Sequence, residues 1–363
     1  MINTLTSLRI FFALMVFGAH CYVIDSSFDA HFFKEGFVGV SFFFVLSGFI
    51  IAYNYQEKLL EKTATKRTFW VARLARIYPL HLLTLLIAVC IGGYVQYSGT
   101  ADWIKHFAAS TFLLQPFFPS ADYFFSFNSP SWSLGCEQLF YFCFPLIVPF
   151  LHTKRSLFIT LLICLPIMLA GMYLTNEEQI KAYWYVNPFT RLPDFFVGVL
   201  LYQFYRSLCN KKLSYSTGTL LEAGAVALFL LFFLCAADIP KVYRYSCYYW
   251  LPVSLIILIF ALQQGGISRL LSNRFLLIGG EISSSFYLIH LFIIDAYMRM
   301  SAHYHWQIQW TISVPVILCI TIILSLLSFY YFEKPANKWV KRIFTKKTII
   351  NQPHGIINKN TTN

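Results

Sequence analysis

The chain has 363 residues, of which 58% are hydrophobic and only 12% are charged. Soluble domains carry roughly 25% charged residues, so this composition excludes an ordinary soluble fold and predicts an all-α polytopic integral membrane protein. The net charge of +12 resides in short segments between apolar stretches, which argues against nucleic-acid binding, and the nine cysteines show no paired spacing that would indicate a metal site.

Ten segments are apolar over about the 20 residues that a transmembrane helix needs. They lie near residues 8–24, 36–55, 76–97, 131–151, 156–174, 188–205, 219–237, 247–263, 276–298 and 308–331. The segment 103–118 is also apolar but short and proline-bounded, so we expect it to lie at the interface or to be re-entrant.

The distribution of basic residues predicts the topology. Ten spans place both termini on one side of the membrane, and that side holds 21 of the 28 Lys and Arg residues. Both termini are therefore predicted to be cytoplasmic. We expect residues 1–345 to form one membrane domain and residues 346–363 to form a short, basic and polar, disordered cytoplasmic tail.

The first span contains two ionisable residues, Arg9 and His20. They are eleven positions apart, or about three helical turns and roughly 16 Å, so they share one helix face. Arg9 alone is compatible with an interfacial anchor. A polar group as deep as His20 normally faces a protein interior or a water-filled cavity.

The third span begins with Arg73 and Arg76 on adjacent positions of one helix face, followed by Tyr78 and Pro79. Two neighbouring guanidinium groups repel each other unless an anion lies between them, and their geometry suits phosphate. The pair is a candidate site for a phosphorylated ligand from the cytoplasm. Interfacial anchoring is the alternative.

Two later spans each bring a carboxylate into the membrane. Glu137 lies about two turns into the fourth span, after Ser131 and Trp132, and needs a partner or a water-filled cavity. Arg191 and Asp194 lie three residues apart in the sixth span, where they either line a cavity or simply neutralise each other within one helix.

The ninth span carries a polar stripe of Ser283, Tyr287 and His290 on one face. With the other three spans, this stripe predicts a shared central cavity. Two classes remain open, a transporter and an intramembrane enzyme. Transporters usually contain internal repeats, and this chain shows none, which favours the enzyme.

At these same residues the sequence resembles the membrane acyltransferase type 3 family. The matching elements occur in order along nearly the whole membrane domain: R-x10-H at Arg9 and His20, GVSFFFVLSGFIIA in the second span, R-x-x-R-I-Y-P from Arg73, W-S-L-x-x-E-x-x-F-Y from Trp132, R-x-x-D-F-x-x-G from Arg191, S-x-x-x-Y-L-x-H from Ser283, and F-E-x-P. Where the family often has two adjacent glutamates, this chain has Glu137 and Gln138. The extracytoplasmic SGNH domain of some relatives does not follow the last span, so transfer is expected to need only the membrane domain.

The resemblance implies a bacterial inner-membrane O-acyltransferase, most readily an O-acetyltransferase, that acts on an extracytoplasmic or lipid-linked saccharide such as O-antigen, capsule or exopolysaccharide. The donor would be acetyl-CoA or another acyl-CoA arriving from the cytoplasm. A proton-coupled exporter of a glycan or lipid precursor is the alternative function. Direct transfer and a covalent acyl-enzyme both remain open, and the sequence does not determine the oligomeric state.

The resemblance also implies roles for individual residues. His20 would be the general base, oriented by Glu137, while Arg73, Arg76 and Tyr78 would hold the phosphates of the donor. The implied oxyanion donors, in order of preference, are Arg9, Tyr287, Ser283 and Ser131. The remaining residues expected at the cavity are Trp132, Arg191, Asp194 and His290.

Overall fold

The computed structural model describes residues 2–91 and 97–349, and within these ranges it contains helices and no strand. Seven described helical segments are long and apolar enough to cross a membrane. They are Asn3–Val23, His31–Leu60, Lys66–Cys90, Lys154–Leu174, Tyr215–Asp238, Arg274–Tyr304 and Trp310–Phe344. The expectation of an all-α, multi-pass membrane protein is confirmed. The count of ten spans and the side on which the termini lie stay predictions.

Each of the ten expected segments overlaps a helix, and part of the third, 76–97, lies outside the described residues. These helices are α1 (Asn3–His20), α3 (Val38–Leu60), α4 (Lys66–Cys90), α7 (Trp132–Ile147), α8 (Lys154–Leu174), α9 (Pro188–Leu208), α10 (Tyr215–Cys235), α12 (Trp250–Leu262), α14 (Arg274–Tyr304) and α15 (Trp310–Leu327). The three that fall outside the seven long apolar segments are α7 and α12, which are shorter, and α9, which contains polar and charged residues.

Short helices connect the long ones. They are α2 (His31–Lys34), α5 (Thr100–Thr111), α6 (Ala121–Phe124), α11 (Lys241–Arg244) and α13 (Gly266–Leu271). The apolar segment 103–118 forms most of α5 and a turn at Gln115–Phe117, and it is not among the seven long apolar segments, which agrees with the expected interfacial or re-entrant placement.

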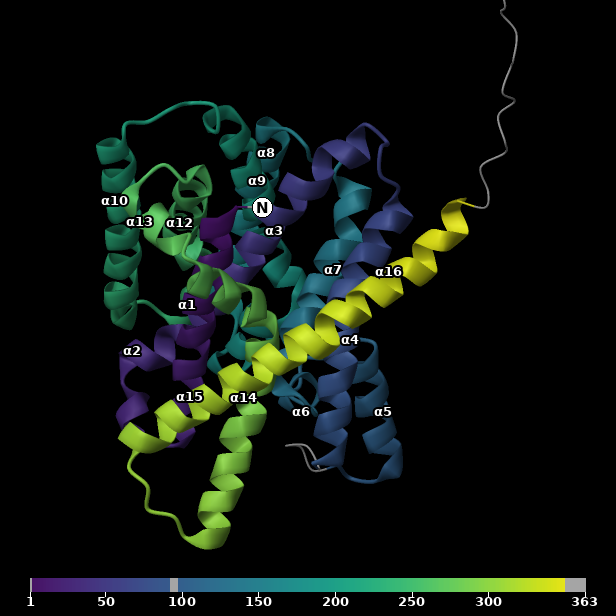
Figure 1. Cartoon of the computed structure of the whole chain (residues 1–363), viewed down its shortest axis with the longest axis vertical. Coiled ribbons are helices and arrows are strands. Elements are labelled where there is room, and N and C mark those ends of the chain that lie inside the picture. The colour runs from purple at the N-terminus through teal and green to yellow at the C-terminus, as the bar shows by residue number, and fades with distance from the viewer. Residues whose placement is uncertain (1, 92–96, 350–363) are drawn as a thin grey trace, which may run out of the picture.

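The C-terminal helix extends past the residue where the membrane domain was expected to end. A π-helical segment, Ser328–Glu333, joins α15 to α16 (Lys334–Ile349), and together they form one long diagonal element across the bundle in Figure 1. The boundary expected at residue 345 therefore lies inside a helix. The rest of the expected tail, residues 350–363, lies outside the described residues.

The helices form a bundle in which α1 and α3 are central and α8 and α10 are peripheral (Figure 1). In the apolar window that contains α3, 72% of the residues are buried, against 17% in α8. The outward face of α8 carries Phe158, Leu162, Ile163 and Ile167, which are all exposed. An apolar exposed face suits lipid, because hydrocarbon tails are as apolar as these side chains.

Polar side chains begin several of the helices. Thr65 accepts a hydrogen bond from the backbone N–H of Thr68 at 3.1 Å, and Thr153 and Ser156 form a reciprocal capping box. Asn187 and Asn273 cap α9 and α14 in the same way. Each cap satisfies an N–H group that has no partner within the helix, which fixes where the helix begins.

Glycines allow the central helices to approach closely. A Cβ on Gly280 of α14 would overlap the backbone carbonyl of Thr6 on α1. Gly48 of α3 and Gly198 of α9 face each other in the same way, each against the partner's backbone. Small residues at helix contacts are a general means of packing helices in membranes. At Gly280 this contact sets the position of α14 relative to α1, and both helices carry site residues.

Replacing Gly280 with alanine should destabilise the bundle, because α1 and α14 must separate to admit a methyl group. We expect a loss of about 1–3 kcal/mol, seen as a lower melting temperature of the detergent-solubilised protein. Gly224→Ala in α10 is the matched control, since a Cβ there meets no atom within 4 Å. Equal melting temperatures for the two variants would contradict the close α1–α14 contact.

Candidate active site

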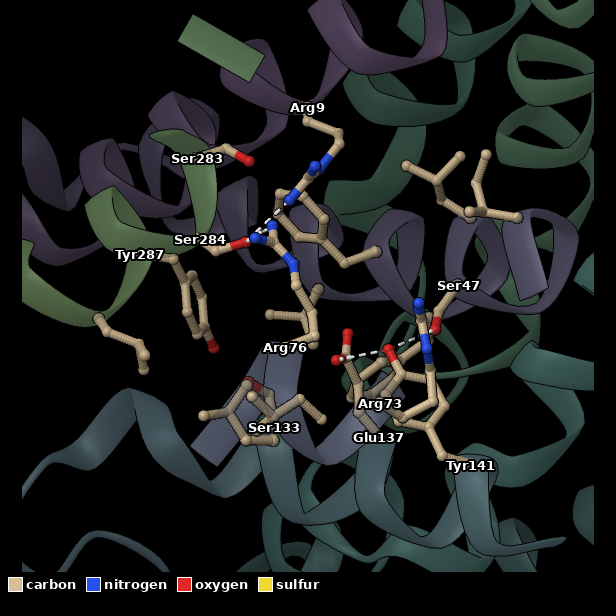
Figure 2. Close-up of a pocket in the computed structure, with 18 of the residues that line it drawn as sticks. Arg9, Ser47, Arg73, Arg76, Ser133, Glu137, Tyr141, Ser283, Ser284 and Tyr287 are labelled. Carbon is tan, nitrogen blue, oxygen red and sulfur yellow. Dashed lines mark hydrogen bonds between the residues drawn. The ribbon is translucent and has the colours of Figure 1, made fainter. Parts of the chain in front are cut away.

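Two cavities lie along α1 and α14. We call the first the arginine cavity; its volume is about 190 Å³, and its polar lining comes from five helices (Figure 2). The polar residues that line it are Arg9 of α1, Ser47 of α3, Arg73 and Arg76 of α4, Ser133, Glu137 and Tyr141 of α7, and Ser283, Ser284 and Tyr287 of α14.

Ser284 connects two of the arginines. Its Oγ accepts a hydrogen bond from Nη2 of Arg9 at 2.8 Å and another from Nη2 of Arg76 at 3.1 Å (Figure 2). The two guanidinium groups therefore meet at one hydroxyl, although they come from helices far apart in sequence. Their like charges repel, so this arrangement needs nearby negative charge.

Glu333 supplies part of that charge. Its carboxylate forms an ion pair with Arg76 and accepts a hydrogen bond from Ser285 Oγ at 2.9 Å. The carboxylate of the π-helical segment before α16 thus meets part of the predicted need for an anion beside the pair Arg73 and Arg76, and the phosphorylated ligand stays a prediction.

Arg73 is held differently. Its guanidinium lies over the rings of Tyr55 and Tyr141, 5.2 and 5.8 Å from their centroids, and its Nη2 lies 3.5 Å from the Tyr55 hydroxyl. Its buried Nε has no hydrogen-bond partner among the described residues. Aromatic faces attract a cation but do not neutralise it, so Arg73 keeps its charge and a donor for an anionic ligand.

Glu137 belongs to a short hydrogen-bond chain. The hydroxyl of Tyr141 donates to Glu137 at 2.9 Å, and Ser47 donates to that hydroxyl at 3.2 Å (Figure 2). Three arginines and two carboxylates, Glu137 and Glu333, thus leave the arginine cavity with an excess positive charge. This charge, together with the unpartnered nitrogen of Arg73, fits a ligand that carries phosphate.

We call the second cavity the histidine cavity. It has a volume of about 630 Å³ and contains His20 at the end of α1. Four aromatic rings form much of its wall. Neighbouring ring centroids are 4.8 Å apart for Trp132 and Tyr185, 4.7 Å apart for Tyr185 and Tyr245, and 4.7 Å apart for Tyr245 and Phe37. Tyr287 lines both cavities, so they adjoin at this residue.

His20 contacts His290 rather than Glu137. Nε2 of His290 lies 3.1 Å from Nδ1 of His20, and Nδ1 of His290 lies 2.7 Å from the carbonyl oxygen of Tyr287. The sequence-based pairing of His20 with Glu137 was wrong in this respect. The two residues line different cavities, since α14 brings His290 against α1 and α7 directs Glu137 toward the arginines.

The hydrogen bonds determine the tautomers of the two neutral histidines. A carbonyl oxygen only accepts, so Nδ1 of His290 carries the hydrogen and its Nε2 is an acceptor. Nδ1 of His20 must then be the donor to it. Consequently Nε2 of His20 carries the lone pair and is the basic nitrogen, as a general base in this cavity requires.

Several residues expected at the cavity lie elsewhere. Arg191 and Asp194 are fully buried, and Nε of Arg191 lies 3.1 Å from Oδ2 of Asp194. Arg191 also donates a hydrogen bond to Ser41 of α3, and Asp194 accepts one from Trp250 of α12. The alternative interpretation of this pair, mutual neutralisation, is therefore the one that the geometry supports. Ser131 is also buried, and its Oγ accepts from Gln115 Nε2 at 3.1 Å, which corrects its expected position at the cavity. Trp132 lines the histidine cavity as expected.

Tyr78 does not line the arginine cavity. It faces a neighbouring cavity of about 370 Å³, and its hydroxyl donates to Oε1 of Gln138 at 3.0 Å. Nε2 of Gln138 in turn donates to the carbonyl of Phe112 at 3.2 Å. A glutamate at this position would lack that donor, so the departure from the family pattern at residue 138 has a structural basis here.

The predicted site residues did not include Ser284, Tyr141 and Glu333. Ser284 and Tyr141 lie within recognised motifs, and Glu333 is the acidic residue of F-E-x-P. An ionisable residue at the end of the last apolar segment was the available signal for Glu333. The ion pair could not be predicted, because 257 residues separate it from Arg76.

A membrane-embedded helix bundle with a basic cavity beside a histidine cavity fits the class of intramembrane transferases. The family model described as an acyltransferase domain matches residues 2–330, so the chain belongs to this acyltransferase family. The predicted enzyme class, an acyltransferase, is thereby confirmed, whereas the acetyl group, the donor and the acceptor stay predictions. No solved structure matches the chain.

Among curated relatives, "Acyltransferase MdmB" of Streptomyces mycarofaciens is 28% identical over 340 residues, which cover 85% of this chain and 83% of the relative. "O-acetyltransferase OatA" of Staphylococcus aureus is 26% identical, covering 85% of this chain and 54% of OatA. "Putative peptidoglycan O-acetyltransferase YrhL" of Bacillus subtilis is 27% identical, covering 87% and 53%. The chain thus spans about half the length of OatA and YrhL.

Glu333→Gln should lower stability, because it removes the charge that opposes Arg76 at the junction of α4, α14 and α16. We expect a loss of about 1.5–3 kcal/mol, measured as a lower melting temperature in detergent. Glu281→Gln is the control, since its pair with Lys334 is 3.5 Å long and partly exposed, and such pairs contribute at most about 1 kcal/mol. A Glu333 variant as stable as the control would argue against this role.

Proposed function

We propose that this protein transfers an acetyl group from cytoplasmic acetyl-CoA to a hydroxyl of an extracytoplasmic or lipid-linked saccharide, at the inner membrane of a bacterium. The observation that carries the proposal is the adjacency of the two cavities at Tyr287. The arginine cavity, at the predicted cytoplasmic end of α1, suits an anionic donor. The histidine cavity, toward the opposite end, suits an acceptor that must lose a proton.

The donor side is supported by charge. Acetyl-CoA supplies an activated acetyl thioester and several phosphates. Arg73 has an unpartnered Nε, and Arg9 and Arg76 converge on Ser284, so these residues would bind phosphate and orient the donor. The arginine cavity, at about 190 Å³, would admit only a slender part of the donor, its pantetheine arm with the diphosphate at the arginines, and the adenosine would remain outside.

The acceptor side is supported by the tautomer of His20. Its Nε2 would take the proton of the attacking hydroxyl while the new C–O bond forms and the C–S bond of the thioester breaks. His290 would hold the ring and stabilise the transient imidazolium through the 3.1 Å hydrogen bond. The proton would then pass to the departing thiolate. Tyr287, at the junction, is the proposed donor to the oxyanion.

The aromatic wall supports a saccharide acceptor. Sugar rings present C–H groups on their faces and hydroxyls at their edges, so they suit a cavity with aromatic faces and a few polar groups. Trp132, Tyr185 and Tyr245 provide such faces in the histidine cavity. The names of OatA and YrhL, which refer to O-acetyl transfer and to peptidoglycan, agree with a glycan acceptor here.

His20→Ala should reduce acetyl incorporation into the cell's glycan by at least about 100-fold, the usual contribution of a general base. NMR of the purified glycan measures the ester, and immunoblotting of membranes checks insertion. His303→Ala is the control, because this residue is exposed near the end of α14. Unchanged esterification in His20→Ala would exclude the general-base role. A glycan without esters in the wild type would instead favour the exporter.

Arg73→Gln should weaken donor binding, because it removes a cation that forms no ion pair with any described carboxylate. We expect the Kd for acetyl-CoA to rise about tenfold, as measured by isothermal calorimetry on the detergent-solubilised protein. Arg67→Gln is the matched control, since Arg67 lies on the same helix but is exposed and outside both cavities. Equal affinities for the two variants would return Arg73 to the role of an interfacial anchor.

A further inference from the structure

Basic residues gather at the histidine cavity. By the predicted topology, only six Lys and Arg residues lie in the extracytoplasmic segments, namely Lys34, Lys105, Lys181, Lys241, Arg244 and Arg299. Four of these six, all but Lys105 and Arg299, line this one cavity. Topology selects against basic residues on this side of a membrane protein, so their concentration at one place requires a reason.

Two of the four cations are already neutralised. Lys34 pairs with Asp29 at 2.7 Å. Arg244 pairs with Glu35, whose other oxygen accepts from the hydroxyl of Tyr249 at 2.6 Å. Asp29 and Glu35 are the acidic residues that line the cavity, and each is engaged by its own partner. They are therefore not free to neutralise the remaining lysines.

Lys181 and Lys241 have no carboxylate partner among the described residues. Glu178 and Asp238 each lie three positions before one of these lysines, yet no ion pair joins them. The Nζ of Lys181 lies 4.5 Å from the ring centroid of Phe125, which attracts its charge but leaves it unneutralised. Lys181 is exposed to solvent over much of its side chain, yet partial desolvation at the cavity, and then the nearby charge of Lys241, lower its pKa.

Two ammonium groups that line one cavity without a carboxylate partner favour the binding of an anion there. Because they face the cavity that contains His20, the anion would belong to the molecule that His20 deprotonates. We propose, on the basis of the function above, that the acceptor is an anionic saccharide whose carboxylate or phosphate is bound by Lys181 and Lys241. The lysines would be specificity-determining residues: they position the acceptor beside His20 and take no part in proton transfer.

The acetylated glycan itself provides the first test. Cells that produce the wild type, Lys181→Gln, Lys241→Gln, or the control Lys105→Gln should be compared by NMR of their glycan. We expect the ester in the wild type to lie on a glycan whose repeat carries a carboxylate or phosphate, or that is carried on a lipid diphosphate. Each cavity variant should reduce ester content about tenfold, and Lys105→Gln, exposed and outside the cavity, should leave it unchanged.

Purified protein distinguishes the two sources of the anion. The probes are a uronic-acid-containing oligosaccharide, the same oligosaccharide after carboxyl reduction, and the reduced oligosaccharide linked to a polyprenyl diphosphate. We expect kcat/KM to be about tenfold higher for one of the anionic probes than for the neutral one, and this preference to vanish in Lys181→Gln and Lys241→Gln while the KM for acetyl-CoA stays the same. The preferred probe identifies the carboxylate or the diphosphate as the recognised group.

Three results would overturn the inference and leave the proposed function intact. The first is an ester found on a neutral glycan with no lipid diphosphate. The second is an equal kcat/KM for the neutral and both anionic probes. The third is that the lysine variants behave like Lys105→Gln. A wild type that forms no glycan ester and consumes no acetyl-CoA with any probe would instead contradict the proposed function, and the inference with it.

Discussion

The structure depends on the need to satisfy charged groups within a membrane-spanning bundle. Arg9 and Arg76 both donate hydrogen bonds to Ser284, and Arg76 forms an ion pair with Glu333. The helices α1, α4 and α14 and the segment before α16 therefore meet at one polar centre. Such groups cannot face lipid without a large free-energy cost, and satisfying them inside the protein fixes which helices are neighbours. The same contacts leave a cavity with an excess positive charge.

The long axis of α1 relates this centre to the second cavity. Arg9 and His20 share one face of α1, and α14 follows that face closely because Gly280 lets its backbone approach Thr6. Tyr287 and His290 of α14 consequently lie beside the path between the two residues. An acyltransferase must bring two reactants together. A basic cavity that adjoins a cavity containing a histidine can hold the two reactants next to each other.

Much of the site was predictable, because a polar residue within an apolar membrane segment indicates that its side chain faces a cavity or a polar partner. Arg9, Arg73, Arg76, Glu137, Ser283 and Tyr287 all line the arginine cavity, where their positions in apolar segments led us to expect them. Arg191 and Asp194 gave the same kind of signal, yet they form a buried pair between helices. A charge in a membrane helix thus predicts a partner, and whether that partner is a ligand or a protein group depends on packing.

The sequence by itself determined the helical class, the approximate helix positions and the shared face of Arg9 and His20, because these follow from local hydropathy and the 3.6-residue period. Only the tertiary structure decided that His290 rather than Glu137 contacts His20, that Glu333 pairs with Arg76, and that the basic residues of distant loops line one cavity. The paired residues are far apart in the sequence: 209 positions for Glu35 and Arg244, 257 for Arg76 and Glu333, and 270 for His20 and His290. No local pattern encodes such contacts, since they arise from how the helices pack.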